Sequence, residues 1–224
     1  EKWGLCPERQ FLIDVPLPAD AAVGALCYLL ACHLRAFGLI CSVDAEAYGG
    51  TLHDADGNLD MDKFREAFHN GIGQWARMSE DKTSMAKYYH SFDARESAEL
   101  YNRMQKYFVE ETRLGIPIMV HEEGLHGHQS FHSTHFPMPL GLACSWDENL
   151  FFDIYTQVAK EIRAKGGHQV LAPVVDVTRD PRWGRTEETM GEDPYLTSRI
   201  VVPYVQGLRS CGVASCVKHY CLNN

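Results

Sequence analysis

Three clusters of charged and aromatic side chains stand out in this 224-residue chain, because each follows a short apolar run. They are HEEGLHG at residues 121–127, RDPRWGR at residues 179–185, and the pair Lys218-His219. A carboxylate such as Glu123 can accept hydrogen bonds from sugar hydroxyls, while Arg185 and Lys218 can donate to neighbouring hydroxyls. Such charge-assisted hydrogen bonds contribute about 1.5–3 kcal/mol each. We therefore predict a polar pocket lined by these three side chains.

Other acidic and basic residues of the same clusters have plainer interpretations. We expect Glu122, Glu187 and Glu188 to be structural or solvent-exposed, because surface ion pairs contribute only about 0–1 kcal/mol. Lys218, at the end of an apolar run, also permits Schiff-base chemistry of the kind that barrel aldolases perform. This lyase alternative stays open beside the polar pocket.

Two metal-site patterns fail on spacing. A zinc-binding helix needs histidines at positions i and i+4, whereas His121 and His126 are five residues apart. The segment that starts at Asp54 suggests a calcium loop, but Leu59 occupies its sixth position, where glycine is required. We therefore expect a turn at Asp54, no metal and no cofactor.

The overall composition excludes several classes of partner. The chain has 21 Lys and Arg against 30 Asp and Glu, a formal charge of −9, so a nucleic-acid backbone is repelled. The apolar run at residues 21–32 is shorter than the roughly 18–20 residues of a membrane span. No C-x-x-C pair occurs among the eight cysteines, which indicates free thiols. We expect neither a nucleic-acid nor a membrane partner.

Helix signals and apolar runs alternate along the second half of the chain. Capping patterns predict helices that begin at Asp93, Ser145 and Asp193, and a shorter helical pattern surrounds Phe64. The apolar runs that predict buried strands are residues 116–120, 169–177 and 213–217. This alternation indicates a parallel α/β sheet, in which the carboxyl ends of the strands converge on one crevice. The polar composition of residues 79–92 predicts a loop. Residues 1–50 show no clear periodicity of apolar residues and stay unassigned.

From about residue 70 onwards the chain resembles the N-terminal barrel domain of glycoside hydrolase family 3, the β-glucosidase and β-xylosidase family. The matching segments are RLGIPIMVHEEGLHGH (113–128), FPMPLGLACSWDENL (136–150), HQVLAPVVDVTRDPRWGRTEETMGEDPYL (168–196) and VKHYCLNN (217–224). The resemblance implies an incomplete (β/α)8 TIM-like barrel over residues 51–224, of the kind that needs about 250 residues when complete. It also implies a periplasmic or secreted protein.

The same resemblance implies a retaining exo-β-glycosidase that acts on terminal β-D-glucosyl residues. By this likeness Glu123, Arg185, Lys218 and His219 hold the terminal sugar, and the substrate is a small oligosaccharide or glycoside. Family members often have aspartate at the position of Glu123, and the longer side chain is similar to that of β-xylosidases, so a β-xylosidase is the alternative.

The two catalytic carboxylates of the family are expected beyond Asn224. We therefore predict that the 224-residue chain alone is inactive. A non-catalytic sugar-binding remnant is the alternative from another functional class.

Overall fold

A computed structural model describes residues 42–44, 52, 54, 58–77, 93–220 and 223, with the backbone alone for residues 42–44. Most of the unassigned first fifty residues and the predicted polar loop at 79–92 lie outside these ranges. The described part contains a sheet of five parallel strands that lie in chain order. The strands are β1 (Ser42–Asp44), β2 (Gln74–Ala76), β3 (Met119–Glu122), β4 (Gln169–Val170) and β5 (Ala214–Ser215). The prediction of a parallel α/β fold is confirmed.

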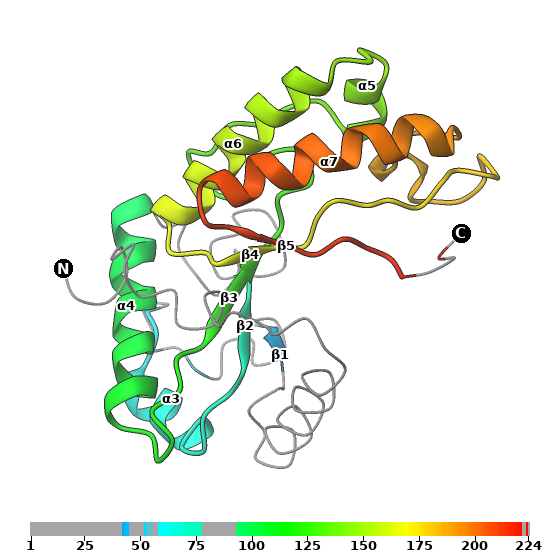
Figure 1. Cartoon of the computed structure of the whole chain (residues 1–224). Coiled ribbons are helices and arrows are strands. Elements are labelled where there is room, and N and C mark those ends of the chain that lie inside the picture. Colours follow the sequence, from blue (N-terminus) through cyan, green and yellow to red (C-terminus); the bar gives the residue numbers. More distant parts are fainter. Residues whose placement is uncertain are drawn as a thin grey trace, which may run out of the picture.

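Helices connect the strands and flank the sheet. They are α3 (Met61–Ala67), α4 (Ala94–Glu110), α5 (Pro139–Ala143), α6 (Glu148–Ala164) and α7 (Pro194–Ser210), with a short 3₁₀ turn, η3 (Thr186–Glu188). In Figure 1, α6 and α7 lie side by side next to β4 and β5, while α3 and α4 lie beside β2 and β3. Within the described ranges, no helix is both long and apolar enough to cross a lipid bilayer.

The helix starts follow the capping chemistry of the sequence, with one exception. Asp93 and Glu96 form the predicted capping box at the start of α4, and Asp193 caps α7 just before Pro194. The predicted cap Ser145 is wrong, because the side chain of Asp147 accepts the first backbone N–H groups of α6. Ser145 instead donates its hydroxyl to the carbonyl of Leu142 at 2.7 Å.

The strands are shorter than the apolar runs, and β3 is displaced along the chain. The run at 116–120 enters the sheet only at Met119, because the side chain of Gln105 takes both backbone groups of Ile118. After β4 the pairing with the β5 segment stops and resumes as a single bridge between Val174 and Lys218. Between these points the backbone N–H groups of Cys216 and Lys218 donate to the carbonyls of Ala172 and Pro173, so the two segments stay in contact although the regular ladder is interrupted. In this part of the chain the peptides Ala172–Pro173 and Lys218–His219 are cis.

Two hydrophobic clusters stabilise the fold. One lies between α3, α4 and the first strands and includes the fully buried rings of Phe64, Trp75 and Phe108. The other lies under α6 and α7, where the rings of Tyr155 and Tyr204 stack with centroids 3.3 Å apart. The second cluster is the one next to β4 and β5, so it supports the segments that carry the predicted pocket.

Gly207 sets the close approach of α6 and α7. A Cβ atom there would lie 2.7 Å from the carbonyl oxygen of Phe152 and 3.0 Å from the backbone nitrogen of Thr156. Backbone atoms of a helix cannot move aside easily, so Gly207→Ala is expected to lower the free energy of unfolding by about 1–3 kcal/mol. The measurement is urea denaturation, with Gly141→Ala in α5 as the matched control, because only Pro137 lies within 4 Å of that Cβ. Equal stability of the two variants would contradict this packing.

Candidate functional site

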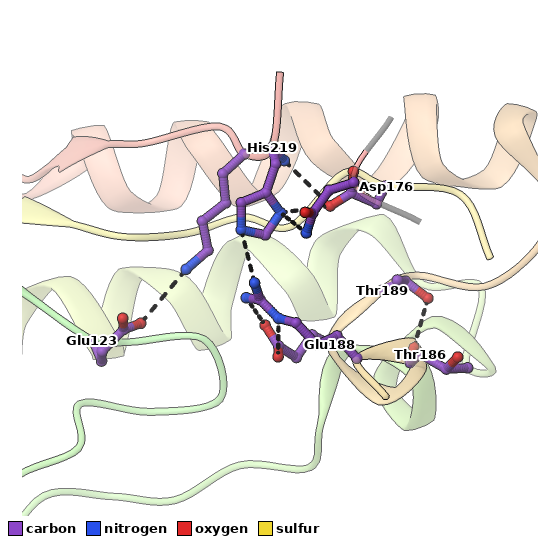
Figure 2. Close-up of polar contacts among 9 residues, drawn as sticks. Glu123, Asp176, Thr186, Glu188, Thr189 and His219 are labelled. Atoms are coloured by element: carbon purple, nitrogen blue, oxygen red, sulfur yellow. Dashed lines mark hydrogen bonds and ion pairs between the residues drawn. The ribbon is translucent and has the colours of Figure 1, made fainter. Parts of the chain in front are cut away.

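The structure brings the four predicted site residues together at the carboxyl end of the sheet. Glu123 directly follows β3, Arg185 comes from the segment between β4 and η3, and Lys218 and His219 follow β5. The ammonium nitrogen of Lys218 lies 3.8 Å from a carboxylate oxygen of Glu123. Nη1 of Arg185 lies 3.0 Å from Nε2 of His219. Figure 2 shows the Glu123–Lys218 pair beside the contact between Arg185 and His219, with the side chains coming from three segments.

Packing beneath the loop that follows β3 holds Glu123 in place. A Cβ on Gly124 would lie 2.5 Å from Cγ2 of Val170, so only glycine lets this loop pass so close to β4. One residue further on, the carbonyl of Leu125 accepts hydrogen bonds from the hydroxyls of Tyr155 (2.7 Å) and Tyr204 (3.3 Å). The stacked tyrosines of α6 and α7 therefore fix the backbone that carries Glu123.

Glu122 has the structural role that we expected, although it is adjacent to Glu123. It is the last residue of β3, where successive side chains point to opposite faces of the sheet. Its carboxylate is buried, accepts the hydroxyl of Tyr101 at 2.6 Å and lies 3.6 Å from Nε2 of His128. Glu122 therefore ties α4 to the loop below the site.

Asp176 orients His219, and we did not predict this residue from the sequence. Its carboxylate is 3 % exposed and lies 2.7 Å from Nδ1 of His219, and it also accepts the backbone N–H of His219 at 3.3 Å. The backbone of Lys218 is fixed in the same way, by hydrogen bonds with Pro173 and Val175. Asp176 is an acidic residue inside the otherwise apolar run 169–177, and this exception in the sequence could have revealed it.

Glu188 holds Arg185, which is the structural one of the two roles that we expected, although we did not predict that it acts within the site. The carboxylate accepts Nε–H of Arg185 at 2.7 Å and Nη2–H at 2.6 Å, the paired geometry that suits a guanidinium. The turn η3 places the two residues on one side, and Thr189 closes it with a 2.8 Å hydrogen bond to the carbonyl of Thr186 (Figure 2). Glu187, by contrast, is exposed as expected.

The carboxylates of the site differ in their electrostatic environment. Burial raises the pKa of Glu123, although the cations of Lys218, Arg77 and Arg185 oppose this effect. The hydrogen bonds from Arg185 lower the pKa of Glu188, so that carboxylate stays ionised. Arg77, which directly follows β2, is a further cation that the sequence did not reveal.

The described residues contain no group of three or more His, Cys, Asp or Glu side chains that could hold a metal ion. Of the segment predicted to be a turn, Asp54 and Asn58 are described and residues 55–57 are not, and the backbone N–H of Asn58 donates to the Asp54 carboxylate at 2.9 Å.

Comparison with known proteins identifies the family of this chain. The model of the glycosyl hydrolase family 3 N-terminal domain matches residues 50–222. The chain belongs to glycosyl hydrolase family 3. A putative β-xylosidase from Formosa agariphila is 34% identical over 161 residues, which are 71% of this chain and 20% of that protein. A β-glucosidase from Bacteroides ovatus is 40% identical over 126 residues, which are 50% of this chain and 17% of that protein.

Solved structures of β-glucosidases share the fold. A β-glucosidase from Erythrobacter marinus superposes with a TM-score of 0.68 at 29% identity, covering 88% of this chain and 25% of that one. A Listeria innocua β-glucosidase in complex with isofagomine gives a TM-score of 0.52 at 29% identity, covering 76% and 20%. The predicted TIM-barrel-like fold is confirmed, and the chain spans about a fifth of the length of the curated relatives above.

Glu123→Gln is expected to raise the free energy of unfolding at neutral pH. Burial raises the pKa of Glu123, so protonation of this carboxyl group favours the folded state. The resulting contribution to stability is complete below the ordinary pKa of 4.5 and is lost as the pH rises through the pKa of the folded state. Glutamine resembles the protonated form at every pH. Urea denaturation between about pH 4 and pH 7 should therefore show a stability difference that grows with pH. The exposed Glu187→Gln is the control, and a difference that does not change with pH would contradict the prediction.

Proposed function

We propose that the four site residues form the subsite that holds the terminal non-reducing sugar in a retaining exo-β-glycosidase. The observation that carries this proposal is the Glu123–Lys218 pair at 3.8 Å, next to Arg185, at the carboxyl end of the strands of a family 3 domain. Side chains at this end of a TIM-type barrel converge on one ligand. The partly buried carboxylate accepts hydrogen bonds from sugar hydroxyls, and the two cations donate to the neighbouring ones.

The same geometry supports binding without bond cleavage by this chain alone. Retaining hydrolysis needs two carboxyl groups about 5–5.5 Å apart, one that attacks the anomeric carbon and one that transfers a proton. The three carboxylates of the described site already have partners, since Glu123 faces Lys218, Asp176 faces His219 and Glu188 faces Arg185. We therefore propose that other residues of the whole enzyme supply the attacking group and the acid/base, so that the 224-residue chain binds the sugar and leaves the glycosidic bond intact.

We propose glucose as the preferred sugar and xylose as the alternative. The relative that covers 71% of this chain is a putative β-xylosidase, which favours the alternative, whereas the two solved structures above are β-glucosidases. The family resemblance implies that aspartate is usual at the position of Glu123, and glutamate is one methylene longer. We infer that the longer side chain leaves less room beside the exocyclic carbon of glucose, which xylose lacks, so its length also favours the xylose alternative.

The test is to titrate the 224-residue chain with glucose and with xylose while recording amide NMR spectra. We expect shifts confined to the segments around Glu123, Arg185 and Lys218. Glu123→Asp is expected to shift the ratio of the two affinities towards glucose. An unchanged ratio would remove Glu123 from the choice of sugar, and binding of neither sugar would contradict the proposed subsite.

Activity is measured in parallel with aryl β-glucosides and aryl β-xylosides. The expected result for the purified 224-residue chain is no turnover of either substrate. Turnover that disappears in Glu123→Gln would show that the chain itself carries the chemistry, and it would overturn the proposal that this chain only binds.

A further inference from the structure

Four side chains of the site form a continuous linear array. Asp176 contacts Nδ1 of His219 at 2.7 Å, Nε2 of the same ring contacts Arg185 at 3.0 Å, and the other side of the guanidinium is held by Glu188 (Figure 2). We propose that Asp176 and Glu188 are positioning residues that fix the protonation pattern of His219 and the orientation of Arg185. This inference rests on the proposed sugar subsite and deepens it, because it specifies which N–H groups that subsite offers.

The direction of each hydrogen bond follows from the chemistry of the groups. A guanidinium has five N–H donors and no acceptor, so Nε2 of His219 must be the acceptor in its contact with Arg185. A carboxylate only accepts, so Nδ1 of His219 must carry the proton that it shares with Asp176. Both contacts are hydrogen bonds only when His219 is neutral and protonated on Nδ1. A doubly protonated ring would set Nε2–H against the guanidinium N–H at 3.0 Å.

Within the described part of the chain, Asn223 makes a further polar contact with this ring. Its side-chain nitrogen lies 3.2 Å from Nδ1 of His219, and Asn223 is exposed. Rotation of the amide about its terminal bond presents the oxygen instead, which then accepts from the same Nδ1–H. The contact is therefore compatible with the proton on Nδ1.

The array leaves a defined set of donors for the ligand. Arg185 uses Nε–H and one Nη2–H on Glu188, and one Nη1–H on His219. Of its five donors, one Nη1–H and one Nη2–H have no partner among the described residues. Because the guanidinium is planar and held on two sides, these two N–H groups point in fixed directions and suit vicinal hydroxyls of one sugar ring. Asp176, although buried, thus acts on the ligand through His219 and Arg185.

The test is the tautomer of His219 in the unmodified 224-residue chain, measured without any sugar. Two-dimensional ¹⁵N NMR of histidine side chains distinguishes a protonated from an unprotonated ring nitrogen, and His219→Gln identifies the signal by its loss. We expect protonated Nδ1 and unprotonated Nε2. Protonation on Nε2, alone or together with Nδ1, would overturn the array whether or not a sugar binds.

Variants separate positioning from a general structural effect. An amide at position 176 can either accept from Nδ1–H or donate to Nδ1, so Asp176→Asn is expected to give a mixture of tautomers and a sugar affinity lower by about 2- to 10-fold. Glu188→Gln should keep the tautomer and lower the affinity by a similar factor. The control is Asp180→Asn, which removes an exposed carboxylate that pairs with Arg182 in the same segment.

The outcomes distinguish this inference from the proposed function. A single Nδ1–H tautomer in folded Asp176→Asn, as judged by amide dispersion, would show that Asp176 does not set the tautomer and would overturn its role. Equal affinity losses in Asp176→Asn and Asp180→Asn would do the same. If no variant and no unmodified chain binds sugar, the proposed subsite fails, while the tautomer measurement still decides whether the array exists.

Discussion

Lys218→Met is expected to weaken the binding of glucose or xylose to the chain by about 10- to 150-fold. This range corresponds to the loss of one charge-assisted hydrogen bond of about 1.5–3 kcal/mol, at about 1.4 kcal/mol per tenfold change in Kd. The side chain of Lys218 is 16% exposed, and its ammonium lies 3.8 Å from Glu123. Its removal therefore also takes a cation from a carboxylate whose pKa burial already raises. Methionine keeps the length of the side chain and most of its packing. Isothermal titration calorimetry with each sugar measures the effect.

The control for this variant is Lys160→Met, which replaces an exposed lysine on α6. It should leave the affinity for both sugars unchanged. If the two methionine variants bind sugar equally well, Lys218 does not belong to the subsite. A fold check by circular dichroism accompanies both, since the backbone of Lys218 also forms the bridge with Val174.

Phe64→Ala is expected to lower the free energy of unfolding by about 3–5 kcal/mol, because it empties the centre of an aromatic cluster. Phe64 is fully buried, and its ring centroid lies 5.0–5.6 Å from those of four other aromatic residues. Those residues are Phe68, Trp75, Tyr107 and Phe108. Urea denaturation followed by circular dichroism measures the loss.

The matched control is Phe152→Ala on α6, where the side chain is 38% exposed. It should change stability by less than about 1 kcal/mol. Phe64 belongs to the cluster near β2 and β3, and the segments of Arg185 and Lys218 rest on the other cluster. We therefore also expect folded Phe64→Ala to keep its sugar affinity, and an equal loss of stability in both alanine variants would contradict the central place of Phe64.

The candidate site was largely accessible from the sequence, because its residues follow apolar runs at strand ends. Glu123, Arg185 and Lys218 could be grouped by one rule, that parallel strands deliver their following residues to a common edge. This rule identifies the segments that meet at the edge of the sheet, but it does not predict which side chains within them contact one another. Asp176 and Glu188 were missed as site residues because their roles depend on which side chain each one faces, and only the packed structure fixes that.

The strands were harder to predict than the helices for a physical reason. Helix starts are encoded by local side-chain caps, so Asp93 and Asp193 were identified correctly, and Ser145 failed only because Asp147 competes for the same N–H groups. Strand ends are set by pairing with distant segments. Strands β1 and β2 have three residues each, which is too few to show an alternation of apolar and polar residues in the sequence. Strand β3 starts late because Gln105 of helix α4 bonds to the backbone of Ile118.

The two stacked tyrosines connect the interface between α6 and α7 to the segment that carries Glu123. The main-chain oxygen of Leu125 accepts one hydrogen bond from Tyr155 of α6 and one from Tyr204 of α7. Any substitution that slides one of these helices along the other therefore pulls on the segment next to Glu123. Sugar affinity in this domain should accordingly be tunable from the seam between α6 and α7, so laboratory evolution is expected to select changes there as well as in the pocket.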